Sequence, residues 1–386
     1  MNQPFLPYGA QSIDEDDIAA VVATLRSPYL TTGPKVAEFE AAVADYVGAA
    51  AGVAVCNGTA ALHATCHALG LGPGDEVVVP ALTFLATANC VRYVGATPVF
   101  ADVCPDSGLV TAETVTAAIS PRTRAVLPVH LTGRPVDLAP IRALTEARGI
   151  ALVEDAAHAL GATYQGQPIG NGQCSEMAIF SFHPVKHMTT GEGGMVVTND
   201  PKLEERLRRF RNHGMVRSPE ALQRESPGPW YYEQQELGYN YRITDIQCAL
   251  GLSQLKRLDH FLLRRRQLAA RYDQLFADCP QVHPVAPGGH RSQSAYHLYS
   301  VLVDFDALGR SRADVMGQLR AAGIGTQVHY IPVPHQPYYQ ALGGKQQDYP
   351  GAADYYRRTL SLPLFPRMDD DDVDRVVDAL SRVLGD

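Results

Sequence analysis

Residues 51–70, AGVAVCNGTAALHATCHALG, decide the fold, because an apolar run ends at Asn57 and a helical pattern opens with Gly58 and Thr59. A continuous run of small and branched apolar residues predicts a strand that is buried on both faces. A strand that leads directly into a helix is the repeating unit of α/β proteins. This short stretch therefore predicts an α/β fold.

The same unit recurs up to about residue 200. Further apolar runs alternate with helical stretches such as FLATANCVRYVG and LAPIRALTEARG, and these runs read DEVVVP, TPVFADV, TRAVLPVHL, IALVED, MAIFSF and GMVVTN. This alternation predicts a mostly parallel central sheet in a three-layer α/β domain. Ligands of such domains gather at the carboxyl ends of the strands.

The chain of 386 residues is long enough for one large domain and a smaller one. We expect a large domain at residues 1–275, with an N-terminal segment and the sheet. From about residue 276 the pattern changes to AYHLYSVLVDF, SRADVMGQLRAAG and a last helix. A small α+β domain is expected at residues 276–386.

Three local signals add detail to the helices. Ser12 is the expected N-cap of the first helix, with Glu15 three residues later. The basic run 264–266 falls in a helical pattern and is expected on its solvent face. The acidic run 369–372 is expected at the start of the last helix, where negative charge meets the positive end of the helix dipole.

Composition excludes several classes of protein. Apolar content of 46%, charged content of 19% and a formal charge of -8 are typical of a globular protein whose main partner is not nucleic acid. The start of the chain lacks a signal-peptide pattern, and no apolar stretch is long enough to cross a bilayer, so we expect a cytoplasmic protein. Seven cysteines without a Cys-x-x-Cys pair favour neither a disulfide framework nor a zinc site.

Lysine is scarce in this chain. Only five of the 33 basic Lys and Arg residues are lysines, and one of them, Lys186, lies in SFHPVKHMTTGEGG at residues 181–194. A lysine amine can lose its proton and form a Schiff base, whereas arginine stays protonated. A lysine is more often simply a surface residue, so the surroundings of Lys186 must decide between the two interpretations.

Two segments could supply binding groups at strand ends. In CNGTAAL, residues 56–62, the helix start at Gly58 and Thr59 could bind a phosphate, although ordinary helix caps show the same pattern. In VEDAAHALG, Glu154, Asp155 and His158 follow a strand. A carboxylate in such a place either caps a helix or pairs with a buried cation.

A third segment, IFSFHPVKH, delivers Ser181 and Lys186 to the same edge of the sheet. His183 and His187 have the spacing of a helical metal site, but Pro184 lies between them, so no metal site is expected. A phosphate cradle, a carboxylate and a Schiff-base lysine are together the three anchors that pyridoxal 5'-phosphate needs. Phe84 could cover the cofactor ring, although a lone Phe is also typical of a core.

The whole chain resembles the DegT/DnrJ/EryC1/StrS family of nucleotide-sugar aminotransferases. The segments that carry the resemblance are YGAQSIDEDDI, LTTGPKVAEFE, NGTAALHA, TFLATAN, VEDAAHALGA, SFHPVKHMTTGEGG, GYNYRITDIQCALGLSQL and VHYIP. The resemblance implies the aspartate-aminotransferase fold, which is fold type I of the pyridoxal-phosphate-dependent transferases. It also implies a homodimer whose active site is shared between subunits.

Within the family, the chain is similar to the branch that makes UDP-4-amino-4,6-dideoxy-N-acetyl-β-L-altrosamine on the pathway to pseudaminic acid. The implied reactants are L-glutamate and UDP-2-acetamido-2,6-dideoxy-β-L-arabino-hex-4-ulose, with pyridoxamine 5'-phosphate formed between two half-reactions. Aminotransferases for D-configured UDP-, dTDP- or GDP-linked 4-keto-6-deoxy sugars are the alternative. Dehydratases of the family typically have histidine in place of Lys186, and a non-catalytic sugar-binding relative could lack Lys186 or Asp155.

The resemblance also assigns roles to residues. Lys186 is the implied Schiff-base lysine and Asp155 the partner of the pyridine nitrogen, while His158, where many relatives have glutamine, lies beside the ring. The remaining implied cofactor residues are Gly58, Thr59 and Ser181 at the phosphate, Phe84 on the ring, and Asn240 reaching the phosphate of the neighbouring subunit. The implied substrate residues are Tyr8, Tyr29, Leu30, Thr31, Gln327, Val328, His329 and Tyr330.

Overall fold

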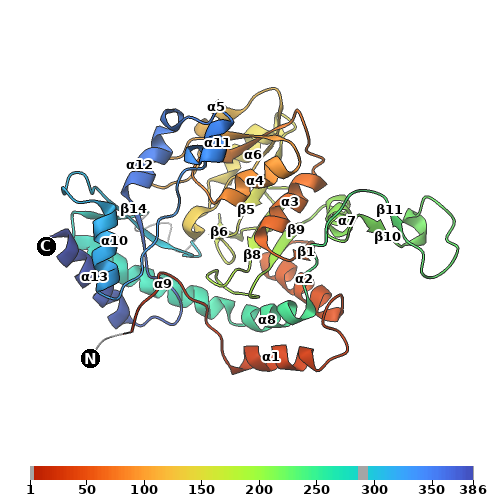
Figure 1. The fold of residues 1–386 in the computed structure, drawn as a ribbon, viewed down its shortest axis with the longest axis horizontal. Coiled ribbons are helices and arrows are strands. Elements are labelled where there is room, and N and C mark those ends of the chain that lie inside the picture. Colours follow the sequence, from red (N-terminus) through yellow and green to blue (C-terminus); the bar gives the residue numbers. More distant parts are fainter. Residues whose placement is uncertain (1–3, 286–293, 386) are drawn as a thin grey trace.

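A seven-stranded sheet forms the centre of the computed structural model, which describes residues 4–285 and 294–385 (Figure 1). The strand order is β1 (Ala51–Val55), β9 (Gly194–Thr198), β8 (Met177–Ser181), β5 (Ala151–Asp155), β4 (Thr123–Val126), β2 (Glu76–Pro80) and β3 (Thr97–Ala101). β9 is antiparallel to β1 and β8, and the other neighbours are parallel. The predicted α/β class and mostly parallel sheet are confirmed.

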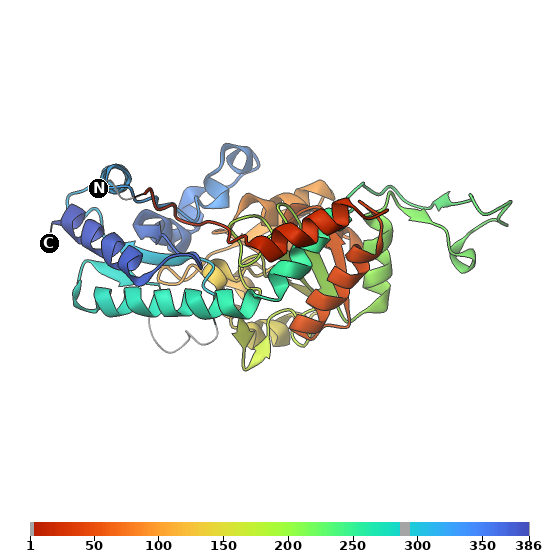
Figure 2. The ribbon, with the colours of Figure 1, turned by 90° about the horizontal axis from the view of Figure 1, so that it is seen from below.

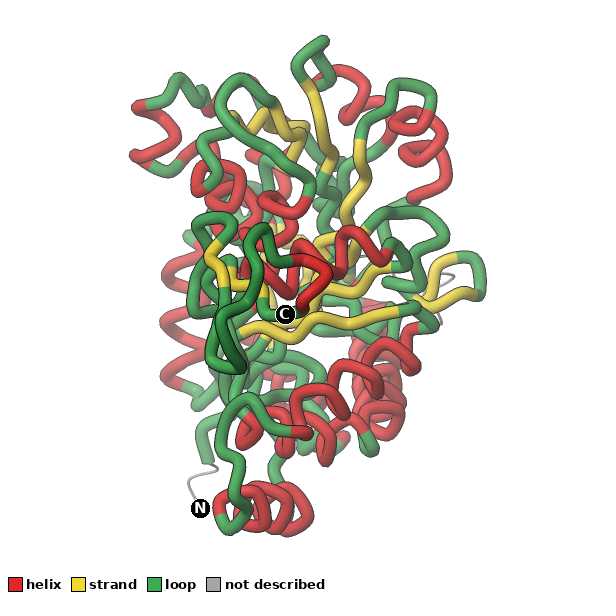
Figure 3. The backbone as a smooth tube through the Cα atoms, turned by 90° about the vertical axis from the view of Figure 1, so that its right-hand side faces the viewer, coloured by secondary structure: helices red, strands yellow, loops and turns green. Residues whose placement is uncertain are grey.

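Helices cover both faces of this sheet (Figure 3). One face packs on α3 (Gly58–Ala68), α4 (Leu85–Tyr93) and α7 (Pro201–Phe210), and the other on α2 (Pro34–Val47), α5 (Ala112–Ala118), α6 (Leu138–Glu146) and α8 (Asp245–Leu255). Successive residues of a strand point to opposite faces. In β1, Val53 and Val55 therefore join one core while Ala54 joins the other. Two cores on one sheet give the three layers.

A third core lies outside the sheet. It combines Leu6, the later half of α9 (Leu258–Leu275), α10 (Arg312–Ala321), α13 (Asp370–Leu384) and a small sheet of β12 (Val282–Pro284), β13 (Tyr299–Val303) and β14 (Thr359–Leu362). Figure 2 shows α9 running from α8 toward α13. The division at residues 275 and 276 stays a prediction.

The remaining elements are short or peripheral. They are α1 (Glu15–Leu25), α11 (Pro337–Ala341), α12 (Pro350–Arg358), β6 (Thr163–Tyr164), β7 (Gln167–Pro168), β10 (Met215–Val216), β11 (Glu233–Gln234), η1 (Leu131–Gly133), η2 (Pro219–Ala221), η3 (Phe276–Asp278), η4 (Val333–His335) and η5 (Gln346–Asp348). The hairpin β10–β11 projects away from the body of the chain (Figures 1 and 2). We call residues 213–239 around it the arm.

The first helix begins later than predicted, whereas the last helix begins where it was predicted to begin. The prediction of Ser12 as N-cap is wrong, because Asp14 caps α1 by accepting a bond from the amide of Asp17, whose side chain accepts from the amide of Asp14. Asp14 and Asp17 thus form the reciprocal capping box that was predicted for Ser12 and Glu15, two residues further along the chain. The acidic run does begin the last helix, with Asp369 as N-cap of α13.

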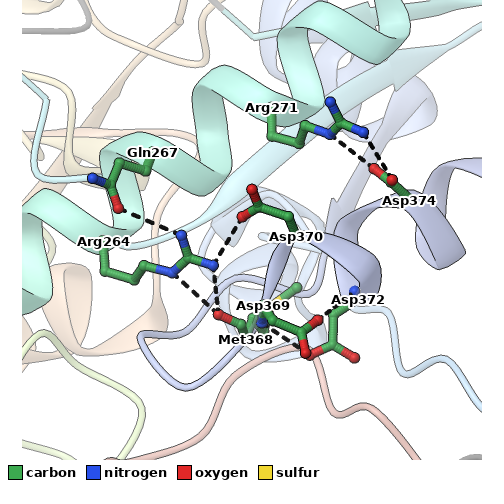
Figure 4. Close-up of polar contacts among 8 residues, drawn as sticks. All are labelled: Arg264, Gln267, Arg271, Met368, Asp369, Asp370, Asp372 and Asp374. Atoms are coloured by element: carbon green, nitrogen blue, oxygen red, sulfur yellow. Dashed lines mark hydrogen bonds and ion pairs between the residues drawn. The ribbon is translucent and has the colours of Figure 1, made fainter.

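The basic run 264–266 was predicted to lie on the solvent face of its helix, but its arginines do not share one environment. Arg264 and Arg271 of α9 reach across to α13, where they bind the carbonyl of Met368 and the side chains of Asp370 and Asp374 (Figure 4). Arg265 is fully buried, so the prediction is wrong for this residue. Neighbouring helical residues point about 100° apart, and the turn of α9 therefore directs Arg265 inward.

Candidate active site

Lys186 lies in the turn that follows β8, at the carboxyl edge of the sheet. Its amide donates a 2.9 Å hydrogen bond to the carbonyl of His183, which closes the turn. The side chain is partly buried. Burial lowers the pKa of the Lys186 amine to about 7, and the nearby Asp155 carboxylate opposes this shift. An amine with a pKa of about 7 is about half neutral at pH 7. Its neutral form can act as a nucleophile or base.

Asp155 ends β5 and is buried. Its Oδ2 accepts a 2.7 Å bond from the hydroxyl of Thr87, and its Oδ1 accepts a 3.2 Å bond from the amide of Ala157. Burial raises the pKa of the Asp155 carboxyl, and the Thr87 bond opposes the rise. Both donors are uncharged, so neither of them neutralises the Asp155 carboxylate. This carboxylate can therefore pair with a cationic group of a ligand.

The start of α3 forms a cradle against the end of β8. Asn57 caps the helix by accepting a 2.8 Å bond from the amide of Ala60, and the amides of Gly58 and Thr59 precede it in the first turn. A Cβ at Gly58 would lie 3.0 Å from Cβ of Ser181 and 3.2 Å from its Oγ. The structure thus brings Gly58, Thr59 and Ser181 together, and only a glycine leaves this space open.

Aromatic and imidazole rings line the rest of the site. The exposed ring of Phe84 lies 5.8 Å from the ring of Tyr330. The Tyr330 hydroxyl is 3.3 Å from Nε2 of the buried His158, and the His158 ring is 4.3 Å from the ring of His297. Nε2 of His297 is in turn 3.5 Å from Nζ of Lys186. These residues come from separate parts of the chain.

The predicted substrate residues divide into two groups. Tyr8 lies with its ring 5.5 Å from that of His329, which precedes Tyr330, so these three residues border the site. Nδ1 of His329 is 2.8 Å from the Ser361 hydroxyl. The side chain of Gln327 accepts from the amide of Val328, while its backbone pairs with Ser361.

The other group, which includes one predicted cofactor residue, lies at the start of α8 and beside Asn212. The exposed segment Tyr29 to Thr31 is held at the start of α8, where the amide of Asp245 donates to the carbonyl of Leu30. Asn240 is exposed and its backbone pairs with Asn212. Among the described residues, no hydrogen bond or ring contact joins Asn240 or residues 29–31 to Lys186 or Asp155.

A cavity of about 530 Å³ borders the segment that follows these residues. Thr32 and Gly33 line one side of it, and α2, α7 and the base of the arm supply the rest. Five arginines contribute to its walls: Arg208, Arg209, Arg211, Arg217 and Arg242. Glu40 pairs with Arg208 and Arg211. Arg209 pairs with Glu236. An anion in the cavity would therefore meet Arg217 and Arg242.

The two histidines of the third segment do not share a site. His183 is exposed, whereas His187 is buried with Nε2 3.1 Å from the carbonyl of Ala295. In residues 4–285 and 294–385 no group of three His, Cys, Asp or Glu side chains is placed to hold a metal ion.

Sequence reasoning missed Thr87 and His297. Thr83 and Thr87 stand four apart around the start of α4, and their hydroxyls are 2.9 Å apart. That spacing, after a strand end, is a signal that could have indicated a polar partner for Asp155. His297 carries no such local signal, because it meets Lys186 only through the tertiary fold.

Comparisons with known proteins agree with this geometry. The model of the DegT/DnrJ/EryC1/StrS aminotransferase family matches residues 11–381. The spore coat polysaccharide biosynthesis protein SpsC of Bacillus subtilis (strain 168) is 44% identical over 384 residues, covering 98% of this chain and 97% of its own.

Solved structures are similar over the whole chain. Helicobacter pylori PseC, an aminotransferase involved in the biosynthesis of pseudoaminic acid, superposes with a TM-score of 0.91 at 30% identity, covering 98% of this chain and 99% of PseC. The putative sugar aminotransferase Spr1654 of Streptococcus pneumoniae, in its PMP form, gives a TM-score of 0.91 at 34% identity, covering 98% of this chain and 99% of its own. Its PLP form gives 0.89 at 33% identity, with 98% of each chain covered.

The fold and the site define a pyridoxal-phosphate-dependent aminotransferase. Three observations show that the residues fit this cofactor: the Gly58 cradle suits a phosphate, buried Asp155 suits a pyridinium nitrogen, and Lys186 has an amine that is readily deprotonated. The chain belongs to the DegT/DnrJ/EryC1/StrS aminotransferase family. In the described part of the chain, no helix combines the length and apolar character that a membrane span requires.

Proposed function

We propose that this aminotransferase moves the amino group of L-glutamate to C4 of UDP-2-acetamido-2,6-dideoxy-β-L-arabino-hex-4-ulose, a UDP-linked 4-keto-6-deoxy-N-acetylhexosamine. The products are UDP-4-amino-4,6-dideoxy-N-acetyl-β-L-altrosamine and 2-oxoglutarate, in pseudaminic acid biosynthesis. The observation that carries the proposal is the pairing of the Lys186 and Asp155 site with a fold that matches PseC over nearly its whole length.

The chain's own residues have defined tasks in this reaction. Pyridoxal phosphate, when bound, supplies an aldehyde that condenses with amines and a ring that withdraws electrons from the substrate. Lys186 would hold the cofactor covalently, and its free amine would move the proton of the reacting carbon, a task that its pKa of about 7 favours. Asp155 keeps the ring nitrogen protonated.

The other cofactor residues hold the group in place. The amides of Gly58 and Thr59, with the Thr59 and Ser181 hydroxyls, would bind the phosphate at the start of α3. Phe84, whose ring lies 5.8 Å from that of Tyr330, would cover one face of the cofactor ring. His158, whose Nε2 lies 3.3 Å from the Tyr330 hydroxyl, would lie beside it. Tyr8, His329 and Tyr330 border the space for the sugar.

The nucleotide diphosphate would meet the arginine-lined cavity next to the segment Tyr29 to Thr31. Arg217 and Arg242 are wall residues whose guanidinium groups can neutralise phosphates. Arg217→Gln should then raise KM for the nucleotide sugar about tenfold, the loss expected for one charged hydrogen bond. The half-reaction with glutamate should keep its rate, since glutamate carries no diphosphate.

A homodimer would complete the site. Asn240 follows the arm and is exposed, and no described hydrogen bond or ring contact joins it to its own Lys186, which suits a role in a neighbouring subunit's site. The arm carries exposed apolar side chains, including Trp230 and Leu237, that a second copy would cover.

An aminotransferase for a different nucleotide 4-keto-6-deoxy sugar is the second candidate. The observation that favours it is the 44% identity to SpsC, a spore coat polysaccharide biosynthesis protein, compared with 30% to PseC. A structure of DesI with its TDP-sugar product is also similar, with a TM-score of 0.87 at 34% identity. The same lysine can serve attack on either face of C4, so the substrate must be determined directly.

The deciding experiment offers the purified protein UDP-4-keto-6-deoxy-N-acetylhexosamines of both C5 configurations, and a dTDP-linked 4-keto-6-deoxy sugar, each with L-glutamate. Mass spectrometry of the nucleotide sugar and release of 2-oxoglutarate report turnover. Amination of the L-arabino substrate alone supports the proposal. Preference for another sugar would transfer the assignment to the second candidate, while loss of all turnover in Lys186→Ala ties the reaction to this site.

A further inference from the structure

We infer that His297 is a positioning residue for the reaction: its Nε2 accepts a hydrogen bond from Nζ of Lys186 and holds this amine in place beside Asp155 whenever the amine is free of cofactor. This inference rests on the proposed role of Lys186. It concerns a histidine of the segment before β13 that lies 111 residues from Lys186 in sequence.

The contact itself is direct. Nε2 of His297 lies 3.5 Å from Nζ of Lys186, near the outer limit of a hydrogen bond. His297 is buried, and its ring is 5.6 Å from the ring of His187 and 4.3 Å from that of His158. Because it is packed against the rings of His158 and His187, His297 has little freedom to rotate away from Lys186.

The backbone that carries His297 is fixed from two sides. Nη1 of the buried Arg265 donates to the carbonyls of Tyr296 and His297 at 3.2 Å each, and to that of Leu364 at 2.9 Å. On the opposite side, a Cβ at Gly133 would lie only 2.9 Å from the amide of His297. Arg265 thus holds three backbone carbonyls, and two of them lie on either side of the His297 α-carbon along the chain.

The charge balance around Lys186 favours a neutral imidazole at His297. Burial holds the pKa of His297 well below its usual range, and the positive charges of Lys186 and Arg265 act in the same direction. The titratable groups that face the lysine from the packed elements are Asp155, His158, His187, His297 and His329, with Arg265 behind them.

A neutral imidazole has one acceptor nitrogen and one donor. With Nε2 accepting from the lysine, Nδ1 of His297 carries the proton. Among the described residues Nδ1 of His297 has no partner, and neither has Nδ1 of His158 in the adjacent ring. If Nε2 of His158 donates to the Tyr330 hydroxyl, Nδ1 of His158 is an acceptor, and one water could then join it to the Nδ1 proton of His297. The polar chain would then run from Lys186 through His297 and His158 to Tyr330.

Such an acceptor stabilises the protonated amine more than the neutral amine. Lys186 must take a proton from one carbon and return it to another atom, so an ammonium form that is held in one place shortens the transfer. Without His297, the partly buried ammonium would lose this uncharged acceptor, and the lysine would be both less basic and less well oriented.

The test measures the pKa of Lys186 in the full-length chain after removal of cofactor. The pH dependence of Lys186 labelling by an amine-reactive acetylating reagent is followed by mass spectrometry of the peptide that contains this lysine. His297→Phe should lower the apparent pKa by about one pH unit, because the ammonium loses a charge-assisted hydrogen bond. His297→Gln, whose side-chain carbonyl can accept the same bond, should restore the wild-type value.

His63→Phe is the matched control, since His63 is also buried but its Nδ1 lies 3.0 Å from the Tyr241 hydroxyl instead. An unchanged or raised pKa in His297→Phe would overturn the inference, as would a Gln variant that behaves like the Phe variant. His297→Met replaces the Phe variant if the latter does not fold. Failure of pyridoxal phosphate to protect Lys186 from labelling would instead count against the proposed function, and leave the pKa comparison readable.

Discussion

The hydroxyl of Thr87 donates a 2.7 Å hydrogen bond to Oδ2 of Asp155, and so connects the first turns of α4 to the carboxyl end of β5. This bond opposes the rise in the Asp155 pKa that burial causes. It therefore helps to keep the carboxylate ionised in a place where its negative charge can pair with a protonated ring nitrogen. The contact joins two segments that are 68 residues apart.

We predict that Thr87→Val weakens cofactor binding about tenfold, the effect of losing one hydrogen bond to a charged group. Without the hydroxyl, the pKa of Asp155 rises further and the carboxylate is less able to hold a proton on the ring nitrogen. Titration of the cofactor-free protein with pyridoxal phosphate measures the change. Thr87→Ser keeps the donor and should bind as the wild type does; equal weakening in both variants would contradict the prediction.

Gly58→Ala should reduce cofactor affinity about tenfold, the effect of one lost charged hydrogen bond at the phosphate. The new Cβ would meet Cβ and Oγ of Ser181 at 3.0 and 3.2 Å, in the space where the phosphate is proposed to bind. Gly317→Ala is the control, because a Cβ there meets nothing within 4 Å. In helix α10 this control should be stabilising by up to about 1 kcal/mol. Thermal denaturation and cofactor titration of both variants separate a local clash from a general loss of stability.

The depressed pKa of Lys186 predicts a pH dependence of stability. Between pH 7 and the ordinary value of 10.5, the unfolded chain holds a proton on this lysine that the folded chain has released. The free energy of unfolding of the cofactor-free protein should therefore rise with pH across this range through this group. Lys186→Met should be more stable than wild type at pH 7, and the difference should disappear toward pH 10.5.

Chemical denaturation at several pH values measures this difference. Lys202→Met changes an exposed lysine and is the matched control. A stability gain in Lys186→Met that is the same at every pH would show that apolar burial, rather than deprotonation of the lysine, is its cause.

Two arginines of α9, six residues apart, should differ sharply in their effect on stability. Arg265→Met would leave three carbonyls without their donor in the interior and should cost about 3 kcal/mol or more. Arg271→Gln removes a surface ion pair with Asp374, and the midpoint of urea denaturation should barely move. Comparable losses in the two variants would be inconsistent with the burial of Arg265.

The proposed homodimer predicts that the arm is needed for association. Leu237 on the arm is 76% exposed in the single chain, and Leu237→Asp should shift the protein toward monomer in analytical ultracentrifugation. Leu342, which is 53% exposed after α11, provides the control variant Leu342→Asp. A wild-type protein that sediments as a monomer would contradict the shared site altogether.

Local sequence predicted a large part of this molecule. The apolar runs became strands of the central sheet because continuous Val, Ile and Ala residues suit strands that are covered on both faces. Asp155 and Ser181, the last residues of their strands, and Lys186, which follows β8, fell at one edge of the sheet because parallel strands end there together. The residues of β9 gave no indication that this strand would run antiparallel to β1 and β8.

Other features depended on distant partners. Arg265 has the same sequence character as Arg264, yet the packing of α9 against residues 296, 297 and 364 buries only one of the two. The N-cap of α1 shifted from Ser12 to Asp14 because Asp14 and Asp17 bind each other's backbone. His297 has no local motif that marks it as a neighbour of Lys186.

The sequence by itself thus determined the layers of the fold, the family, and the lysine and carboxylate at the centre of the site, since strand runs, helix starts and scarce reactive residues are local properties. Only the tertiary structure decided the surroundings of those groups: the hydroxyl of Thr87 on Asp155 and the imidazole of His297 beside Lys186. The physical reason is that hydrogen bonds and burial act over a few ångströms in space. They select partners that can stand anywhere along the chain.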